Sequence, residues 1–283
     1  MPERAPSDPV ALTVAGPDRA RFLQGQLTQD VAAVVPDRAP LGAFLTPQGR
    51  VIALPRLLAR DETLVLLLPD ELAAPLEAHL RRYLLRAKVT LALPGDALAV
   101  RVIAEGGAPP SATATHRRRA DGVSEVTLPG RTLLVGPAAL LPPPPDTDER
   151  AQLELAAIRA GEPTVTAATR EAFIPQMLNL DLLQGVSFSK GCYTGQEIVA
   201  RTQHLGRIKR RMFRYAAQGA AAPPPAGSTL VDAHGRTAEV VRSAATADGV
   251  ELLAVFALEA RLEPLVAPDG TRLLPVALPY AVE

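Results

Sequence analysis

Apolar residues recur with two different periods along the first hundred residues of the chain. A period of 3.6 residues predicts one helix over Arg19–Val31, with Asp18 at its N-cap, and a second over Asp70–Ala87. Pro47-Gln48-Gly49 has the composition of a hairpin turn. Short apolar runs of strand length predict strands at Val10–Gly16, Leu41–Thr46, Arg50–Leu58, Thr63–Leu68, Val89–Leu93 and Ala97–Ala104.

The middle of the chain is polar and rich in proline. Gly106 to Asp121 is predicted to be a solvated loop, although the arginines that follow His116 could instead contact phosphate. The proline run Pro142–Pro145 predicts a stiff connector. A helix follows the connector, with Asp146 or Asp148 as its cap and Gly161 at its end.

From Ile208 onward the pattern changes to short strands separated by turns, including Val250–Ala257 and Leu273–Leu278. Strands at near-regular spacing predict a small all-β domain, of which a barrel is the simplest form. The chain is therefore predicted to be an α+β protein with an N-terminal region at 1–206, a connector near 142–147 and a C-terminal β-barrel at 207–283.

Composition narrows the class of protein. The 283 residues are 47% hydrophobic, which is enough for a folded core of two or three substructures. The 30 basic and 30 acidic residues balance, so no direct binding of nucleic acid is expected. A single cysteine excludes an intrachain disulfide and a four-thiolate metal site. Without a signal core or an apolar run of about 20 residues, we expect a cytoplasmic protein with no membrane contact.

The single cysteine, Cys192, lies in a turn that has glycine on both sides. The turn joins a predicted strand at Val186–Phe188 to a predicted helix at Gln196–Leu205 that ends at Gly206. A helix N-terminus presents unpaired N–H groups and positive charge, and Lys190 adds a cation two residues away. Both effects favour the thiolate over the thiol, so a functional thiol is the preferred interpretation.

The residues of this segment can also be explained without a function in chemistry or binding. Most free cysteines are buried and inert, although the polar flanks of Cys192 are unlike a core sequence. Glu197 could simply stabilise the first helical turn or pair with Arg201 at i+4 on the surface. No histidine lies within ten residues of the cysteine, so a local Cys–His nucleophile pair is unsupported.

The sequence KGCYTGQE around Cys192, with FIPQ and NL before it and IVAR after it, resembles the signature of the YgfZ family. These folate-binding proteins have a GcvT-like aminomethyltransferase fold and are linked to iron–sulfur protein maturation and tRNA modification. Arg21–Val31 is similar to the opening helix of that superfamily, and Leu278-Pro279-Tyr280 is similar to the family's tail. The resemblance spans nearly the whole chain and is densest from Phe173 to Gly206.

The resemblance implies a fold, a cofactor and a set of site residues. The implied fold has α+β substructures around a central folate cavity and a β-barrel at the C-terminus, and the implied cofactor is tetrahydrofolate or another folate. Cys192 and Lys190 are the implied catalytic residues. The implied folate-binding residues near the cavity are Gly191, Tyr193, Gly195, Gln196, Glu197 and Arg159.

The chain departs from the superfamily's enzymes at three places. The stretch Gly49–Leu54 offers no carboxylate where the glycine-cleavage aminomethyltransferases carry a catalytic aspartate, which argues against that activity. Arg159 takes the place of a glutamate that accepts hydrogen bonds from the pterin, and a guanidinium can only donate. The Arg159 guanidinium could instead bind the glutamyl tail of the folate. The chain has no tryptophan; Tyr193, Phe22, Phe44 or Phe173 could stack on a pterin, but core packing is expected for the phenylalanines.

Three hypotheses follow for the function. The first is a folate-binding protein that supports iron–sulfur enzymes or their assembly proteins through Cys192, and affects tRNA modification indirectly. The second is a folate-dependent one-carbon transferase acting on an unidentified amine, which needs a carboxylate or equivalent base in the cavity. The third is a binding scaffold that has lost folate.

Overall fold

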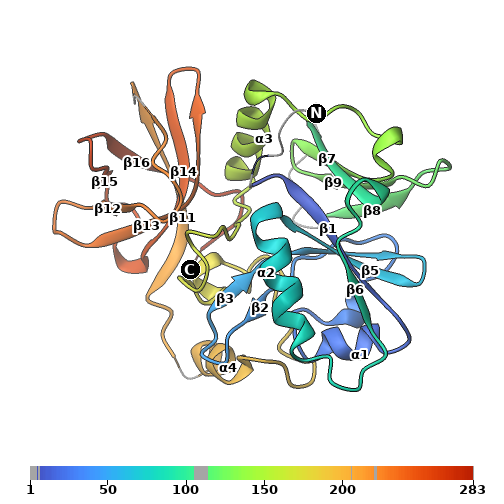
Figure 1. The fold of residues 1–283 in the computed structure, drawn as a ribbon. Coiled ribbons are helices and arrows are strands. Elements are labelled where there is room, and N and C mark those ends of the chain that lie inside the picture. Colours follow the sequence, from blue (N-terminus) through green and yellow to red (C-terminus); the bar gives the residue numbers. More distant parts are fainter. Residues whose placement is uncertain (1–4, 6, 105–113, 205, 220–221, 283) are drawn as a thin grey trace.

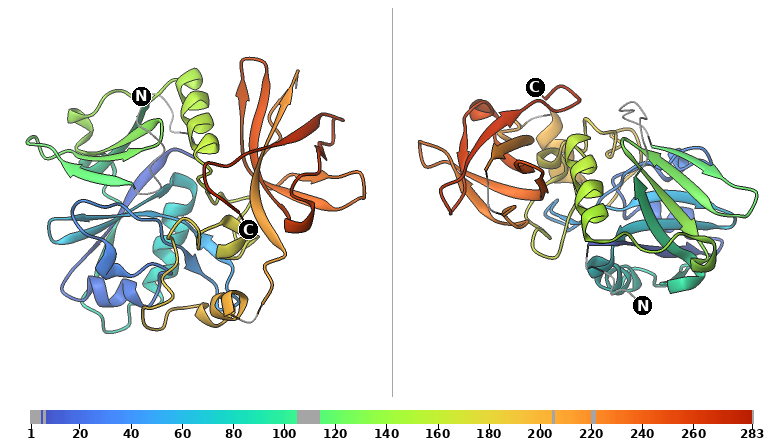
Figure 2. Two further views of the ribbon diagram at one scale, coloured as in Figure 1. Left: turned by 180° about the vertical axis from the view of Figure 1, so that it is seen from behind. Right: turned by 90° about the horizontal axis from the view of Figure 1, so that it is seen from above.

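The computed structural model describes residues 5, 7–104, 114–204, 206–219 and 222–282. Two antiparallel four-stranded sheets form the N-terminal region, and a closed six-stranded barrel lies beside them (Figure 1). Helix α3 (Thr147–Arg159) stands between the sheets and the barrel in the views of Figures 1 and 2. None of the helices in the described part of the chain is long and apolar enough to cross a membrane.

The first sheet has the strand order β4-β5-β1-β6. Its two faces are both buried, because alternate residues of each strand enter different cores. Leu12 of β1 and Leu66 of β5 pack in the main core, whereas Ala11 and Leu67 face the second sheet. The strands are β1 (Pro9–Ala15), β4 (Arg56–Arg60), β5 (Thr63–Pro69) and β6 (Thr90–Ala92).

Helix α2 (Asp70–Arg81) covers the main-core face of this sheet with an apolar stripe of Leu72, Leu76 and Leu80. The helix ends six residues before the predicted Ala87, because turns follow it and Leu85 takes a left-handed backbone conformation with φ of 46°. Helix α1 (Arg19–Gln24) is also shorter than predicted. Its expected second half instead pairs with the neighbouring hairpin, where the backbone N–H of Thr28 donates to Ala43.

Asp18 occupies the N-cap position of α1 but does not cap the helix with its side chain. Its carboxylate accepts a hydrogen bond from the backbone N–H of Lys88 at 2.8 Å instead. The predicted N-cap position is therefore confirmed, but the Asp18 side chain ties the start of α1 to the chain that leads into β6 instead of capping the helix.

The predicted turn Pro47-Gln48-Gly49 is confirmed between β2 (Phe44–Leu45) and β3 (Val51–Ala53), which pair antiparallel. The predicted single strand Arg50–Leu58 is wrong, because the chain breaks at Leu54-Pro55. Proline has no N–H for a strand ladder, so β3 stays with the hairpin and β4 joins the first sheet.

The second sheet has the order β7-β10-β9-β8. Part of the predicted loop at 106–121 forms β8, so that prediction is wrong for Thr115–Arg118, while residues 106–113 lie outside the described residues. Arg117 pairs with Glu125 on β9, and Arg118 pairs with Asp61 in the turn between β4 and β5. The strands are β7 (Ala99–Ala104), β8 (Thr115–Arg118), β9 (Ser124–Leu128) and β10 (Arg131–Gly136).

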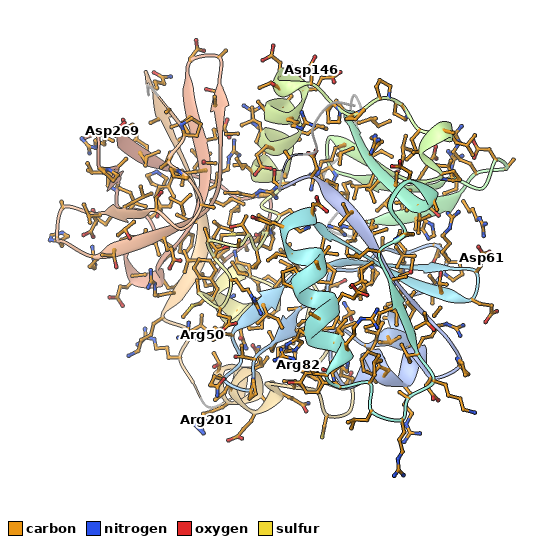
Figure 3. All side chains as sticks on the ribbon, viewed as in Figure 1. Arg50, Asp61, Arg82, Asp146, Arg201 and Asp269 are labelled. Carbon is orange, nitrogen blue, oxygen red and sulfur yellow. The ribbon has the colours of Figure 1, made fainter. Side chains whose placement is uncertain are left out.

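Helix α3 begins at a capping box, and this decides between its two candidate caps. The Asp146 carboxylate accepts from the backbone N–H of Glu149 at 2.9 Å, and the Glu149 side chain accepts from the backbone N–H of Asp146 at 3.0 Å. Figure 3 shows Asp146 at the start of the helix. At the other end Gly161 adopts a φ of 64°, as its predicted place at the helix end requires.

The barrel is closed in the order β11-β14-β13-β12-β15-β16, so the predicted C-terminal barrel is confirmed. Residues of β11 and β14 alternate between two cores. Tyr215 and Phe256 fill the barrel, while Met212 and Val255 point outward into the main core. The strands are β11 (Arg210–Gln218), β12 (Thr229–Val231), β13 (Thr237–Thr246), β14 (Gly249–Ala257), β15 (Leu265–Val266) and β16 (Arg272–Val276).

Five short 3₁₀ turns complete the described secondary structure, with helix α4 (Gln196–His204) after the cysteine loop. The turns are η1 (Val31–Ala33), η2 (Gly95–Leu98), η3 (Ala138–Leu140), η4 (Pro175–Leu178) and η5 (Leu258–Ala260). The C-terminal tail returns from the barrel toward the N-terminal region (Figure 2). There the Tyr280 hydroxyl donates a hydrogen bond to the Gly161 carbonyl at 2.7 Å.

Candidate functional site

A cavity of about 630 Å³ lies where the first sheet, the second sheet, α3 and the barrel meet. Much of its wall is aliphatic, with leucines from both sheets and from α3. The charged residues on the wall come from the same four parts of the fold. They are Asp8, Arg56, Arg131, Arg150, Glu154, Glu162 and Arg242.

Glu162 is the centre of the charged part of this wall. One of its carboxylate oxygens accepts from Arg56 of β4 at 2.8 Å, and the other pairs with Arg131 of β10 at 2.9 Å. Its backbone carbonyl accepts from Arg242 of β13 at 2.8 Å. Arg242 in turn forms a bidentate ion pair with Glu154 of α3, in which its Nε and Nη2 donate to the two carboxylate oxygens at 2.6 and 2.7 Å. This network joins two sheets, a helix and the barrel.

The ionisation of Glu162 is fixed by its neighbours. Burial alone would raise the pKa of the carboxyl group, but the charges of Arg131, Arg56 and Arg242 outweigh that effect and lower the pKa to about 2. Glu162 is therefore a carboxylate at neutral pH and a very weak base. Its role in the cavity is to hold arginines and to accept hydrogen bonds.

These cavity residues were not identified from the sequence, which offered no candidate for the carboxylate that a one-carbon transferase needs in the cavity. Asp8, Glu154 and Glu162 all line the cavity, each in an ion pair with an arginine. A signal was present, because Arg56 and Arg242 each interrupt an apolar run of strand length, where a buried charge must find a partner.

A second cavity, of about 210 Å³, shares part of its wall with the first. Leu41, Leu128, Arg56 and Glu162 line both. The smaller cavity also has Gln29, Arg38 and Tyr280 on its wall. The Arg56–Glu162 ion pair therefore lies in the partition between two adjoining spaces.

Cys192 is exposed, and it is not among the residues that line either cavity. It precedes the first residue of α4 by four positions. The predicted strand at Val186–Phe188 is wrong, because these residues have no strand geometry, although the backbone N–H of Ser187 donates to Thr28 at 2.9 Å. The cysteine loop is thus attached to the segment around Thr28, and its thiol faces away from the core.

Two glycines bring the cysteine loop against the β2–β3 hairpin. Gly195 has a φ of 81°, and a β-carbon there would lie 2.6 Å from the carbonyl oxygen of Thr46. Gly49 at the hairpin turn has a φ of 73°, and a β-carbon there would lie 2.9 Å from Cβ of Ile198 on α4. Both positions combine a backbone conformation and a close approach that favour glycine. A β-carbon at Gly191 would have no neighbour within 4 Å, so this position, unlike the other two, leaves room for a side chain.

Lys190 points into the protein. Its ammonium donates to the backbone carbonyls of Leu27 at 2.8 Å and Gln29 at 2.7 Å, and it lies 5.2 Å from the centre of the Tyr193 ring. Burial lowers the pKa of Lys190 to about 8, partly opposed by the charge of Asp30. The residue anchors the loop from inside, and its predicted role as activator of the thiol stays a prediction.

The other sequence-predicted residues lie in different surroundings. The Tyr193 ring is buried in the main core, and burial raises its pKa to about 12. The backbone N–H of Gln196 donates to Tyr193 at 3.2 Å. Glu197 is exposed, and its carboxylate lies 3.5 Å from the guanidinium of Arg201. This is the i+4 surface pair that the sequence offered as the non-functional explanation of Glu197. Figure 3 shows Arg201 at the outer edge of α4.

Arg159 lies at the end of α3 and pairs with Glu251 of β14 at 2.7 Å, so it joins the helix to the barrel. It is not among the residues that line either cavity. Phe22, Phe44 and Phe173 are buried in the main core, as expected for packing residues. In the stretch that lacks the catalytic aspartate, β3 is fully buried and Leu54 lines the large cavity.

Known proteins resemble this chain in sequence and in fold. No family model matches it. It is 32% identical to tRNA-modifying protein YgfZ of Serratia proteamaculans (strain 568), over 96% of this chain and 90% of that protein. It is 34% identical to the protein of the same name from Pectobacterium carotovorum subsp. carotovorum (strain PC1), over 77% of this chain and 71% of that protein.

Among solved structures, the glycine cleavage system aminomethyltransferase T from Bartonella henselae matches with a TM-score of 0.67 at 12% sequence identity. The match covers 98% of this chain and 85% of that chain. At this identity the likeness concerns the fold alone. It confirms the predicted aminomethyltransferase-like α+β architecture.

The glycines of the cysteine loop provide a matched pair of substitutions. Gly195→Ala should destabilise the protein by about 1–3 kcal/mol, because the added methyl group meets the Thr46 carbonyl and the backbone conformation is strained. Gly191→Ala should change stability by no more than about 0.5 kcal/mol. Urea unfolding measures both. Equal effects of the two substitutions would contradict the described docking of the loop on the hairpin.

The titration of Lys190 should be resolved by NMR, because a chain with three lysines gives few lysine signals. NMR of protein labelled with ¹³C at the lysine ε-carbons should show one signal that titrates near pH 8 and disappears in Lys190→Arg. Because the pKa of Lys190 falls from 10.5 to about 8 on folding, the unfolded chain holds more protons between these values. The contribution of this group to stability should therefore rise as the pH increases from about 8 to 10.5. Absence of any lysine signal titrating below about pH 9.5 would show that the ammonium is not buried as described.

Proposed function

The chain belongs to the YgfZ family, and from this premise we propose that it binds a folate in the large cavity and supports tRNA modification through iron–sulfur enzymes, with Cys192 as its reactive group. The observation that carries the proposal is the combination of a ligand-sized cavity with a separate, exposed thiol on a loop anchored from inside. A ligand site and a partner-facing group then occupy different parts of one structure.

The residues of the large cavity suit a folate in size and chemistry. Its volume of about 630 Å³ lies within the range of about 300–1,000 Å³ that is usual for small-molecule sites. Leucine side chains such as Leu54, Leu128 and Leu153 offer apolar walls for a flat ring. The described lining contains no aromatic side chain, so aliphatic contacts would replace ring stacking.

Polar recognition would come from the ion pairs on the cavity wall. Glu154 and Asp8 offer carboxylate oxygens that can accept from the amino and ring N–H groups of a pterin. Arg150 and Arg242 offer donors for the carboxylates of a glutamyl tail. Bound tetrahydrofolate would supply a carrier for one-carbon units. Arg159, which pairs with Glu251, would support this site through the contact between α3 and the barrel.

The exposed position of Cys192 supports a role for its thiol in contact with a partner protein. Because Cys192 is exposed, a group on a partner protein could reach its side chain. One thiolate is far short of the ligand set of a stable iron–sulfur cluster, so a partner would provide the remaining ligands. We place this partnership in the cytoplasm, with iron–sulfur enzymes or their assembly proteins, and we take the effect on tRNA to be indirect because the chain carries no net charge.

A one-carbon transferase remains the second candidate, and the carboxylates of the cavity are the observation in its favour. The three of them are committed to arginines, and the pKa of Glu162 is about 2, so Glu162 is unsuited to remove a proton at neutral pH. The binding and maturation role therefore takes precedence over catalysis of aminomethyl transfer.

Folate binding can be tested by calorimetry with tetrahydrofolate. Wild-type protein should bind saturably in the micromolar range, and Ala151→Phe should weaken binding at least about tenfold, because Ala151 lines the cavity and a phenyl ring would fill part of it. Gln152→Phe is the matched control, since Gln152 is the exposed neighbour on the same helix. Lack of binding by wild type would overturn the folate proposal and favour a scaffold that has lost its ligand.

The role of Cys192 can be tested by complementation in a strain that lacks its own copy of the gene. Cys192→Ser should fail to restore the activity of iron–sulfur enzymes that modify tRNA, measured as modified nucleosides by mass spectrometry. Ser189→Ala, three residues away on the same exposed loop, should restore it fully. If Cys192→Ser restored activity as well as wild type at equal protein levels, the thiol would have no part in the function.

A further inference from the structure

The charged groups of the two cavities do not balance. Arg56 and Arg131 are both buried and share the single carboxylate of Glu162, which leaves one positive charge in excess (two minus one), while Arg242 is balanced by Glu154. A charge held away from water is costly unless it is paired. The arrangement is therefore suited to an additional negative charge from a ligand.

The excess charge extends to the smaller cavity. Arg56 lies on the partition and is only 8% exposed, and its guanidinium donates to the Ala39 carbonyl at 2.7 Å. Arg38, the residue next to Ala39, lines the same cavity. Within the described part of the chain, the Arg38 guanidinium has no hydrogen bond or ion pair. Two arginines, the exposed Arg38 and the buried Arg56, thus line a small cavity in which Glu162 is the only carboxylate among the described lining residues.

The remaining polar groups of this cavity are already engaged. The side-chain amide of Gln29 donates to the carbonyls of Leu41 and Gln184 at 2.9 and 2.7 Å. The hydroxyl of Tyr280 donates to the Gly161 carbonyl. These groups form a fixed wall and leave Arg38 as the main donor for a ligand. Arg56 already donates to Ala39 and Glu162, so it would contribute mainly its positive charge. The cavity volume of about 210 Å³ is several times the roughly 30 Å³ that one water molecule occupies in the liquid. It is smaller than the roughly 300–1,000 Å³ of a site for a drug-sized ligand.

We propose that the smaller cavity is a binding site for a carboxylate, held between Arg38 and Arg56. The carboxylate would come from a free small acid or from the glutamyl end of a ligand in the adjoining large cavity. A carboxylate suits the site because a guanidinium can present two parallel N–H groups to its two oxygens. The proposal rests on the charges and volume of the smaller cavity and does not require that folate binds.

Titration calorimetry with succinate tests this site, with succinamide as the uncharged probe of the same shape. Wild-type protein should bind succinate saturably and should not bind succinamide. Arg38→Gln should weaken succinate binding at least about tenfold, because one charge-assisted contact is lost. Arg86→Gln is the matched control, since Arg86 is exposed and lines neither cavity.

A repeat of the titration with saturating tetrahydrofolate distinguishes the two sources of the carboxylate. Competition between the two ligands would assign the site to the glutamyl end of the folate, and independent binding would assign it to a free acid. No saturable binding of succinate, equal binding of succinamide, or equal losses in Arg38→Gln and Arg86→Gln would overturn the proposal. Failure of tetrahydrofolate to bind would refute the proposed folate function and leave the succinate result to stand alone.

Discussion

Three arginines that share two carboxylates hold this protein's parts in register. Arg56 belongs to the first sheet, Arg131 to the second, and Arg242 to the barrel, and all three reach Glu162 just beyond the end of α3. Removing one partner of a buried ion pair typically costs about 3–5 kcal/mol, because the other charge is left unpaired. Separate structural units are therefore joined by an interaction that tolerates little displacement, and the large cavity exists because these units meet around it.

The turn that carries Glu162 is itself fixed from the far end of the chain. Gly161 has a left-handed conformation, and a β-carbon there would lie 2.7 Å from the ring of Tyr280. The Tyr280 hydroxyl bonds the Gly161 carbonyl and accepts from the side chain of Asn179. The tail after the barrel thus packs on the residue before Glu162. This explains why a chain of several small units can keep a charged cavity in one geometry without a disulfide.

Local patterns in the sequence predicted the parts of the structure that local physics decides. The helix that begins at Asp70, the hairpin turn at Gly49 and the strands of the C-terminal barrel follow from periodicity, turn chemistry and strand spacing. The sequence pattern did not predict features that depend on contacts between residues far apart in the chain. The helix expected to reach Val31 ends at Gln24 because Thr28 pairs with Ala43, and the cavity charges became visible only once residues far apart in the sequence, such as Arg56 and Glu162, were seen in contact. The motif located Cys192 but could not show that Lys190 turns inward.

The inward turn of Lys190 bears on how the thiol and the cavities are related. Its ammonium binds the carbonyl of Gln29, and the Gln29 side chain in turn binds Leu41 and Gln184 on the wall of the smaller cavity. The loop is therefore connected to the cavity wall by hydrogen bonds, while its sulfur lies outside both cavities. A group that changed the cavity wall would act on the base of the loop rather than on the thiol itself. In this geometry a ligand in the cavities would be coupled to the base of the Cys192 loop through Gln29 and Lys190, without contact with the sulfur.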